Sequence, residues 1–376
     1  MASLTSAEKH YRLALSLVPG IGAVRLKKLL AYFGSAQAVF AAAHKGNTFL
    51  PYTLAQSITS SSSLARAEKI LQLHASEAIQ LLTIEEDIYP KRLLDLPDRP
   101  AILYYKGQAL LNQQRVVTIV GTRQLTPYGQ AAITKFLEEL LPYQPLVVSG
   151  LAYGADIWVH KQALEIGLTT VAVLPTSLDQ IYPTAHKKIA LEMCGGSGGL
   201  LTEYPIGSGL GPYTFVARNR ILAGLADVTI VIEAKEKSGA LITAYYANSY
   251  HREVFALPGS IYSATAAGCH RLIKRNQAHL LTHIDDLVYI MNWEVDKPSQ
   301  SDTYLNYPLT ESEQTVFIQV QEATQPITID ALIHATDLPP GILQAALLSL
   351  ELQGLLHALP GKRFTIAPIY SHNRKV

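Results

Sequence analysis

The feature that most constrains the fold is a repeated alternation of short aliphatic runs with helix-like segments. Runs such as "RVVTIVG" at 115–121 and "DVTIVIEA" at 227–234 are almost continuously apolar and end at glycine or at charged residues. A helix-like segment, "ADIWVHKQALEIG" at 155–167, lies between them. Strands that are apolar on both faces and alternate with helices are typical of a parallel sheet covered by helices on each side. The pattern therefore predicts an α/β domain with an extended Rossmann-like parallel sheet.

Different patterns flank this domain. We expect a small helical domain of helix-hairpin-helix or SAM-like type at 1–80 and the extended Rossmann-like domain at 81–290. A linker is expected at 291–308, where proline, serine and other polar residues gather. Three helical segments followed by a hairpin predict a winged-helix domain at 309–376.

The two terminal domains leave their roles open. "PGIG" at 19–22 separates two helical segments and precedes Arg25, Lys27 and Lys28, so it could hold a DNA phosphate or could be a simple tight turn. The third helical segment of the winged helix, from Pro339 to Gly354, contains no lysine or arginine. Because a helix that enters a phosphate-lined groove should be basic, we expect a structural or protein-contact role for it.

Composition narrows the function class. The 376 residues carry a formal net charge of only +1, so any nucleic-acid site must be a local patch. Neither of the two cysteines is in a CxxC pair, which argues against a zinc site and fits a reducing compartment. No run is long and apolar enough for a membrane span or signal peptide. We expect a cytoplasmic protein without a membrane partner.

The ends of the predicted strands carry the candidate site, because ligands of open parallel sheets bind beyond the carboxyl ends of the strands. "VVSGLAYGAD" at 147–156 is a strand, a glycine-rich turn and a helix start. Free backbone amides and the helix dipole at such a turn favour an anion. The sequence therefore predicts an anion site on this edge.

Cofactor and metal motifs do not fit. The turn after the first strand of the alternating region is "GTRQLTPYG", which lacks G-x-G-x-x-G, and no P-loop occurs. "GGSGG" at 195–199 matches G-x-S-x-G but precedes a strand rather than the helix that a nucleophile elbow needs. No histidine pair has metal-ligand spacing on a helix, and His160, one turn after Asp156, is expected in a core or surface pair. We expect no cofactor and no metal.

A catalytic alternative rests on two carboxylates. Glu203 and Glu233 both end predicted strands, and paired carboxylates can catalyse N-glycosidic cleavage. They can equally cap helices or pair with arginines, and the structural role is the favoured interpretation.

The strand ends together form a cationic and aromatic rim. Cations that follow a backbone and rings that stack on bases suit a single nucleic-acid strand. Alternatively, the arginines pair with Asp156, Glu203 and Glu233. "RNR" at 218–220 is placed at a helix start, where positive charge opposes the dipole and an anion would relieve the conflict. The rim comprises Arg123, Arg218, Arg220, Lys235 and Lys237, with Tyr128, Tyr153, Tyr213 and Phe215.

The same motifs resemble the DNA-processing proteins of the DprA/Smf family. The resemblance covers about 81–285 and includes "VGTR", "SGLAYGAD", "TEYP", "RNRILAGLAD", "SGALITA" and "REVFALPGS" in order. It implies a fold that binds single-stranded DNA without catalysis and forms a homodimer through the Rossmann-like domain. It also implies protection of incoming DNA and loading of the RecA recombinase onto it during natural transformation.

Carried over by position, the resemblance implies a DNA site built from four loops. The basic residue usual before the last glycine of the second loop is replaced here by Tyr153, which removes a phosphate contact and adds a ring. A family Pro-Arg pair reads Val216-Ala217, which removes another cation. The implied site comprises Gly121, Arg123, Ser149, Gly150, Tyr153, Gly154, Phe215, Arg218, Asn219, Arg220, Lys237, Ser238 and Gly239.

An enzyme is the rival class. Nucleotide phosphoribohydrolases also place a glycine-rich rim, an arginine and a glutamate on a Rossmann-like domain, with a "PGGxGTxxE" site motif. This chain has "SGALITA" at 238–244 and no acidic residue at the corresponding spacing. The single-strand-binding interpretation is therefore preferred.

Overall fold

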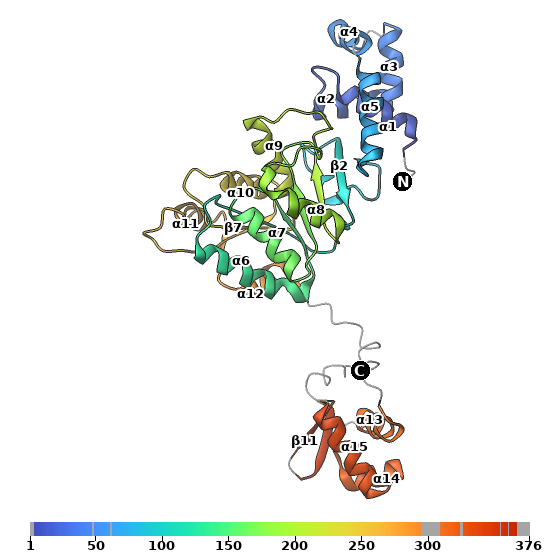
Figure 1. The fold of residues 1–376 in the computed structure, drawn as a ribbon, viewed down its shortest axis with the longest axis vertical. Coiled ribbons are helices and arrows are strands. Elements are labelled where there is room, and N and C mark those ends of the chain that lie inside the picture. Colours follow the sequence, from blue (N-terminus) through green and yellow to red (C-terminus); the bar gives the residue numbers. More distant parts are fainter. Residues whose placement is uncertain are drawn as a thin grey trace. The chain divides into compact units, whose positions relative to one another are not determined.

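The structure is a computed structural model that describes residues 4–46, 49–60, 62–294, 309–323, 326–353, 355–359 and 361–366. The chain forms two compact units, Met1–Asp296 and Lys297–Val376 (Figure 1). Most of the expected linker and the last residues of the expected winged helix lie outside the described residues.

A nine-stranded sheet forms the centre of the first unit, with the order β1-β2-β6-β5-β4-β3-β7-β8-β9. The strands from β6 to β9 in this order are parallel, whereas β2 pairs antiparallel with both of its neighbours, β1 and β6. The expected α/β class is confirmed. The bounds are β1 (Gln80–Thr83), β2 (Ile102–Gly107), β3 (Val116–Gly121), β4 (Leu146–Ser149), β5 (Thr170–Val173), β6 (Gly199–Thr202), β7 (Val228–Ile232), β8 (Glu253–Ala256) and β9 (His279–Leu280).

Helices precede the sheet and connect its strands. The N-terminal helices are α1 (Ser6–Ser16), α2 (Ala23–Phe33), α3 (Ala36–His44), α4 (Tyr52–Ser60) and α5 (Ser63–Ser76). The later helices are α6 (Pro127–Leu140), α7 (Ala155–Glu165), α8 (Lys187–Gly195), α9 (Pro212–Leu225), α10 (Gly239–Ser249), α11 (Ala267–Lys274) and α12 (Ile284–Met291). Short 3-10 turns are η1 (Lys91–Leu93), η2 (Leu141–Tyr143) and η3 (Thr184–His186).

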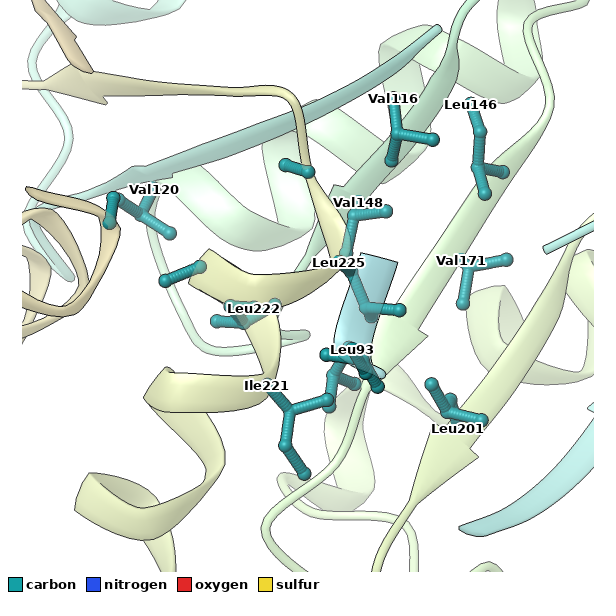
Figure 2. Close-up of a cluster of buried hydrophobic side chains, with 14 of the residues drawn as sticks. Leu93, Val116, Val120, Leu146, Val148, Val171, Leu201, Ile221, Leu222 and Leu225 are labelled. Carbon is teal, nitrogen blue, oxygen red and sulfur yellow. The ribbon is translucent and has the colours of Figure 1, made fainter. Parts of the chain in front are cut away.

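Alternate residues of each strand enter opposite cores. Val116, Val148 and Val171 pack with Leu222 of α9 in a core that also receives α10 and α11 (Figure 2). Val117, one position away from Val116, packs instead against α6, α7 and α12. Because successive side chains point to opposite faces, both faces of a doubly covered strand must be apolar. This requirement explains the continuous aliphatic runs.

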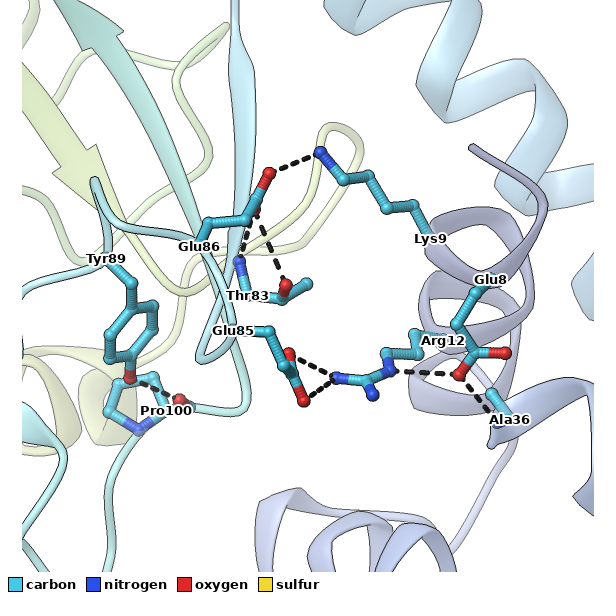
Figure 3. A network of polar contacts seen from close by, with 9 residues as sticks. All are labelled: Glu8, Lys9, Arg12, Ala36, Thr83, Glu85, Glu86, Tyr89 and Pro100. Carbon is cyan, nitrogen blue, oxygen red and sulfur yellow. Dashed lines mark hydrogen bonds and ion pairs between the residues drawn. The ribbon is translucent and has the colours of Figure 1, made fainter. Parts of the chain in front are cut away.

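The N-terminal helices are attached to the sheet by a shared core and by ion pairs. Leu13 and Phe40 belong to the same buried cluster as Leu81, Tyr104 and Leu200 of the sheet. Ion pairs supplement this apolar contact at the turn after β1, as Figure 3 shows. The Arg12 guanidinium lies 2.7 Å from both carboxylate oxygens of Glu85, Lys9 pairs with Glu86, and Glu8 accepts hydrogen bonds from Arg12 and from the Ala36 amide.

The second unit has the winged-helix architecture expected from its sequence. The expected third helix is α15, and lysine and arginine are absent from it. Leu332, Leu343 and Leu350 contribute to the hydrophobic core of this second unit. Its elements are α13 (Glu311–Glu322), β10 (Ile327–Thr328), α14 (Ile329–Thr336), α15 (Pro340–Leu352), β11 (Leu356–Leu359) and β12 (Arg363–Ile366).

Candidate nucleic-acid interface

A pocket of about 470 Å³ opens where the strand order of the sheet reverses, beyond the carboxyl ends of β3 and β7. Strands β3, β4, β5 and β6 follow one another in one direction, and β7 returns to the other side of β3. Such a reversal point is where open α/β sheets bind ligands. Three segments form most of its wall: the loop after β3, the middle of α9, and the loop that leads from β7 into α10.

The structure brings most of the predicted site residues to this pocket. It does not bring Ser149, Gly154 or Arg220 into the wall, and Gly150 and Tyr153 line a smaller adjoining cleft instead. The pocket wall contains Gly121, Arg123, Phe215, Arg218, Asn219, Lys237, Ser238 and Gly239 from the predicted set.

Two glycines let the loops approach each other closely. A Cβ on Gly121 would lie 2.1 Å from the Ile232 carbonyl oxygen, because the ends of β3 and β7 meet there. Gly154 has a φ of +78°, and a Cβ on it would lie 2.2 Å from the Thr122 carbonyl oxygen. Only glycine accommodates both the positive φ and that separation. These two glycines therefore shape the site without contacting its interior through a side chain.

Arg218 forms the floor of the pocket and is already bonded within the protein. Its side chain is buried, and Nη1 donates hydrogen bonds of 2.6 Å to the carbonyl oxygens of Gly150 and Val173. A Cβ on Gly150 would lie 2.3 Å from this Nη1 and 2.4 Å from Oδ2 of Asp156. The missing side chain of Gly150 thus leaves the space that the Arg218 guanidinium and the Asp156 carboxylate occupy.

Burial dominates the electrostatics of this floor. It raises the pKa of Asp156 above the usual range for an aspartate, while the nearby Arg218 acts in the opposite direction. Burial likewise lowers the pKa of Arg218, and Asp156 opposes that shift. Each charge is therefore the main compensation for the other in a desolvated position.

Behind the floor lies His160 of α7, which is fully buried. Its Nδ1 is 2.8 Å from the Thr170 hydroxyl oxygen. Burial, followed by His186 and Arg218, lowers the pKa of His160 to about 3. Of the surface and core positions expected for this histidine, the structure shows the core position.

The rim of the pocket carries cations of a different kind. Arg123 is exposed, and its guanidinium carbon lies 5.6 Å from the centre of the Phe215 ring. Lys237 is exposed after β7. Within the described residues, neither side chain forms an ion pair or a hydrogen bond. Both charges are therefore available to a ligand.

The start of α10 adds uncharged donors. Ser238 caps the helix, accepting a 3.3 Å hydrogen bond from the Ala240 amide, and a Cβ on Gly239 would meet only open space. Asn219 is held against this turn because its side-chain amide donates to the Gly239 carbonyl oxygen at 3.2 Å. The positive end of the α10 dipole lies at this open turn and favours a phosphate or another anion.

An aromatic cleft adjoins the rim. Gly150, Tyr153, Tyr182 and Phe215 line it together with the two pocket arginines, Arg123 and Arg218. Tyr182 meets Phe215 edge to face, with 5.7 Å between ring centres. Tyr153 is 51% exposed and meets the ring of His186 at 4.8 Å. The cleft presents ring edges and faces beside the free guanidinium of Arg123.

Arg220 departs from its predicted position. Helix α9 begins at Pro212, so "RNR" lies in its middle rather than at its start, and the predicted conflict with the helix dipole does not occur there. Arg220 pairs with Glu203 and lies 4.0 Å from Asp98, outside the pocket wall. Two residues along a helix differ by about 200°, which sends Arg218 and Arg220 in different directions.

The two candidate catalytic carboxylates lie far apart along the sheet, and each is bonded to other residues of the protein. Glu203 follows β6 and pairs with Arg220, whereas Glu233 follows β7, four positions away across the sheet. Glu233 accepts hydrogen bonds from the amide and hydroxyl of Thr126 and from the hydroxyl of Thr265. Both residues thus have internal partners, as the favoured structural interpretation expects.

Sequence reasoning missed two residues that support the site. Gln124 accepts a 3.1 Å hydrogen bond from Lys235 across the pocket mouth, and Tyr182 forms one side of the aromatic cleft. Tyr182 lies in "QIYP", one of the strand-end segments, so its position was a usable signal. Gln124 also lies in a strand-end turn, "GTRQLTPYG", but its hydrogen bond to a lysine of a different loop left no local signal.

The described residues also lack two features of other protein classes. No helix there is long and apolar enough to cross a membrane. Among the same residues, no cluster of three or more histidine, cysteine or acidic side chains has the arrangement of a metal site.

Comparison with known proteins matches both units of the chain to family models. Residues 80–292 match the model described as DNA recombination-mediator protein A, and residues 305–362 match the DprA winged helix domain. Protein Smf of Synechocystis sp. is 32% identical over 96% of this chain and 99% of its own length.

Two solved structures share this architecture. The X-ray structure of DNA processing protein A from Streptococcus pneumoniae is similar with a TM-score of 0.64 and 33% identity, over 76% of this chain and 98% of that one. DNA processing protein A from Helicobacter pylori, whose structure concerns a single-stranded DNA binding mode, has a TM-score of 0.51 and 33% identity. That likeness covers 57% of this chain and 96% of that chain.

Proposed function

Because the chain belongs to the DprA/Smf family of DNA-processing proteins, we propose that it binds single-stranded DNA in the pocket at the reversal point of its sheet. The observation that carries the proposal is the combination of free rim cations with helix N-terminal amides and an adjoining aromatic cleft. The relative from Helicobacter pylori binds single-stranded DNA and supports the ligand class.

The rim suggests how a strand would lie. Arg123 lies in the loop after β3 and Lys237 in the loop between β7 and α10, and both line the pocket, so they would contact phosphates of one strand. Backbone amides at the start of α10 would donate hydrogen bonds to another phosphate without adding charge. Bases turned toward Tyr153 and Phe215 would stack on exposed ring surface, which stabilises single-strand binding by about 1–3 kcal/mol per base.

We propose binding without catalysis. A glycosidic reaction needs an acid and a base on the two sides of one bond, with carboxyl groups roughly 5–9.5 Å apart. Glu203 and Glu233 follow strands four positions apart, and both are occupied by internal partners. Asp156, the acidic residue in the pocket wall, lies in the floor beside Arg218.

Membership of the family also suggests a cellular role for the protein. We propose that the protein protects incoming DNA in the cytoplasm during natural transformation and loads RecA onto it. The description of the matching family as a DNA recombination mediator supports this role. The exposed cations and rings of the pocket would hold the strand while a recombinase assembles on its free parts.

We also propose a homodimer through the Rossmann-like domain. The sheet ends at the two-residue strand β9, where Leu280 is half exposed, and the neighbouring α12 exposes Tyr289 at 87% together with Ile290. Exposed apolar side chains beside a sheet edge are typical of an association surface. Sedimentation should show a dimer that Tyr289→Asp converts to a monomer, and a monomeric wild-type protein would contradict the proposal.

Fluorescence anisotropy with a labelled dT strand and a matched duplex tests the DNA site. We expect the single strand to bind more tightly than the duplex, with affinity falling as salt rises because phosphate contacts release counterions. Nucleoside monophosphate should neither compete strongly nor be consumed.

The double variant Arg123→Ala/Lys237→Ala should bind about tenfold or more weakly and lower the log–log salt slope by about 1.4, at about 0.7 per single-strand phosphate. Lys161→Ala is the matched control, because this exposed lysine of α7 lies outside the pocket wall. Equal losses in both proteins, or unchanged binding in the double variant, would contradict the proposed site.

A further inference from the structure

A second ligand-sized groove lies on the N-terminal helices, away from the residues of the proposed DNA pocket. It has a volume of about 240 Å³, and one of its walls is a single face of α2. Arg25, Lys28 and Tyr32 are spaced three and four positions apart on that helix and so share one face. Phe49 comes from the segment after α3 and completes the groove.

Charge in this region is one-sided. No aspartate or glutamate occurs from residue 9 to residue 67, whereas seven lysines and arginines do. Lys9 and Arg12 are neutralised by glutamates at the turn after β1. Lys28 is exposed, and within the described residues it forms no ion pair. The groove is therefore locally positive, although the net charge of the whole chain is only +1.

Exposed rings stand next to these cations. Tyr32 is 58% exposed and Phe49 70% exposed, and their ring centres lie 5.0 Å apart at an interplanar angle of 41°. Phe33 supports Tyr32 from beside it at 4.8 Å. Tyr32 and Phe49 together form an exposed aromatic patch beside Lys28, and contiguous exposed apolar patches commonly mark binding sites.

The hairpin before α2 presents the cationic end of the groove. Gly20 has a φ of +84°, and its carbonyl oxygen accepts a 2.6 Å hydrogen bond from Arg25. This bond fixes the guanidinium at the entrance while leaving its other nitrogens for an anion. Helix α2 has no acidic residue, so nothing on this helix competes for that charge.

From these observations we propose that the groove is a second binding site for single-stranded DNA, separate from the pocket at the reversal point. Arg25 and Lys28 would contact phosphates, and Tyr32 and Phe49 would stack on unpaired bases. A protein partner that matched this surface would have to supply acidic groups and apolar groups together; a single strand supplies phosphates and bases at every nucleotide. The ligand class rests on the proposed function, but the site does not share residues with it.

The test uses the full chain in the Arg123→Ala/Lys237→Ala background, in which the first pocket is disabled. Anisotropy with a labelled dT strand should still show binding. Adding Tyr32→Ala should weaken it about fivefold or more, because a stacked base is lost, while Tyr32→Phe should retain it. Adding Lys28→Ala should lower the salt slope by about 0.7.

Lys27→Ala is the matched control. Lys27 is an exposed lysine on the same helix, but it lies outside the groove wall. It should leave the affinity and the salt slope close to those of the background. A strand carrying 5-iododeoxyuridine should crosslink to Tyr32 or Phe49 on irradiation.

Three results would overturn the proposal. One is complete loss of binding in the background alone. The second is an equal effect of Lys27→Ala and Lys28→Ala. The third is equal loss of duplex and single-strand binding in Tyr32→Ala, which would show that the ring does not stack on bases. If the wild type itself fails to bind a single strand, the proposed function fails as well, so the two failures are distinguishable.

Discussion

The floor and the rim of the pocket contain the same kinds of residue in opposite situations. In the floor, Arg218 is only 5% exposed and bonded to two backbone carbonyls, with Asp156 beside it. On the rim, Arg123 is exposed, and its guanidinium lies over the ring of Phe215. An arginine of the floor therefore holds the protein together, whereas an arginine of the rim is available to a ligand.

The number of arginines and lysines in the binding loops therefore overstates the positive charge that a ligand can contact. Burial and internal partners remove Arg218 and Arg220 from the available set, and the exposed Arg123 and Lys237 remain. Substitutions in the floor should change stability first, and those on the rim should change binding alone.

The largest expected effect is from Arg218→Ala. It should lower the free energy of unfolding by about 3–5 kcal/mol, because it leaves Asp156 as a buried charge without its cation and frees two buried carbonyls. Urea unfolding measures the loss, and Arg123→Ala, with the same charge change, is the control. If the two variants were equally stable, the division into floor and rim would be wrong.

Gly150→Ala should come next, at about 3 kcal/mol. The new methyl would lie within 2.4 Å of two buried charged atoms, so Arg218 and Asp156 would have to move apart. Gly239→Ala is the comparison, since its methyl would meet open space. Thermal unfolding of both variants should show a large decrease in Tm only for Gly150→Ala; similar Tm values would argue against the tight floor.

Lowering the pH should decrease the free energy of unfolding through His160, which is buried behind the pocket floor. Its folded-state pKa of about 3 lies below the unfolded value of 6.5, so the unfolded state binds the proton more readily. The contribution of His160 to the free energy of unfolding is fully present above pH 6.5 and is lost as the pH decreases toward 3. Between pH 7 and pH 5 the loss from this group should be about 2 kcal/mol.

The variant His160→Gln should reduce this pH dependence in urea unfolding at pH 7 and pH 5. His74, whose pKa burial lowers to about 4, would account for part of the remaining slope. A slope as steep in the variant as in the wild type would show that His160 does not carry the effect.

The smallest expected effect is from Arg123→Lys on the rim. The charge stays, so the salt slope of single-strand binding should not change. The planar contact with Phe215 weakens, so the affinity should decrease about threefold while the Tm stays constant. A lower salt slope would show that Arg123 contacts more than one phosphate.

The sequence was sufficient for the sheet and for the loops at its strand ends. Aliphatic runs that are buried on both faces leave few alternatives, and the parallel arrangement then places those loops on one edge. It was not sufficient for the directions of Arg218 and Arg220. Those depend on which side of α9 packs over the floor, which its tertiary partners decide. Helix α9 also begins at Pro212, more than one turn before the predicted position. The close approach at Gly150 involves three separate segments, which no local pattern reports.

The attachment of the N-terminal helices has a consequence for how DNA length is sensed. A common core and the ion pairs of Arg12 and Lys9 hold the α2 groove at a constant separation from the sheet pocket. A strand that reaches both sites binds the second one at a high effective concentration, whereas a shorter strand gains nothing from it. Affinity should then rise in one step at a threshold number of nucleotides, so that the protein acts as a molecular ruler for unpaired DNA.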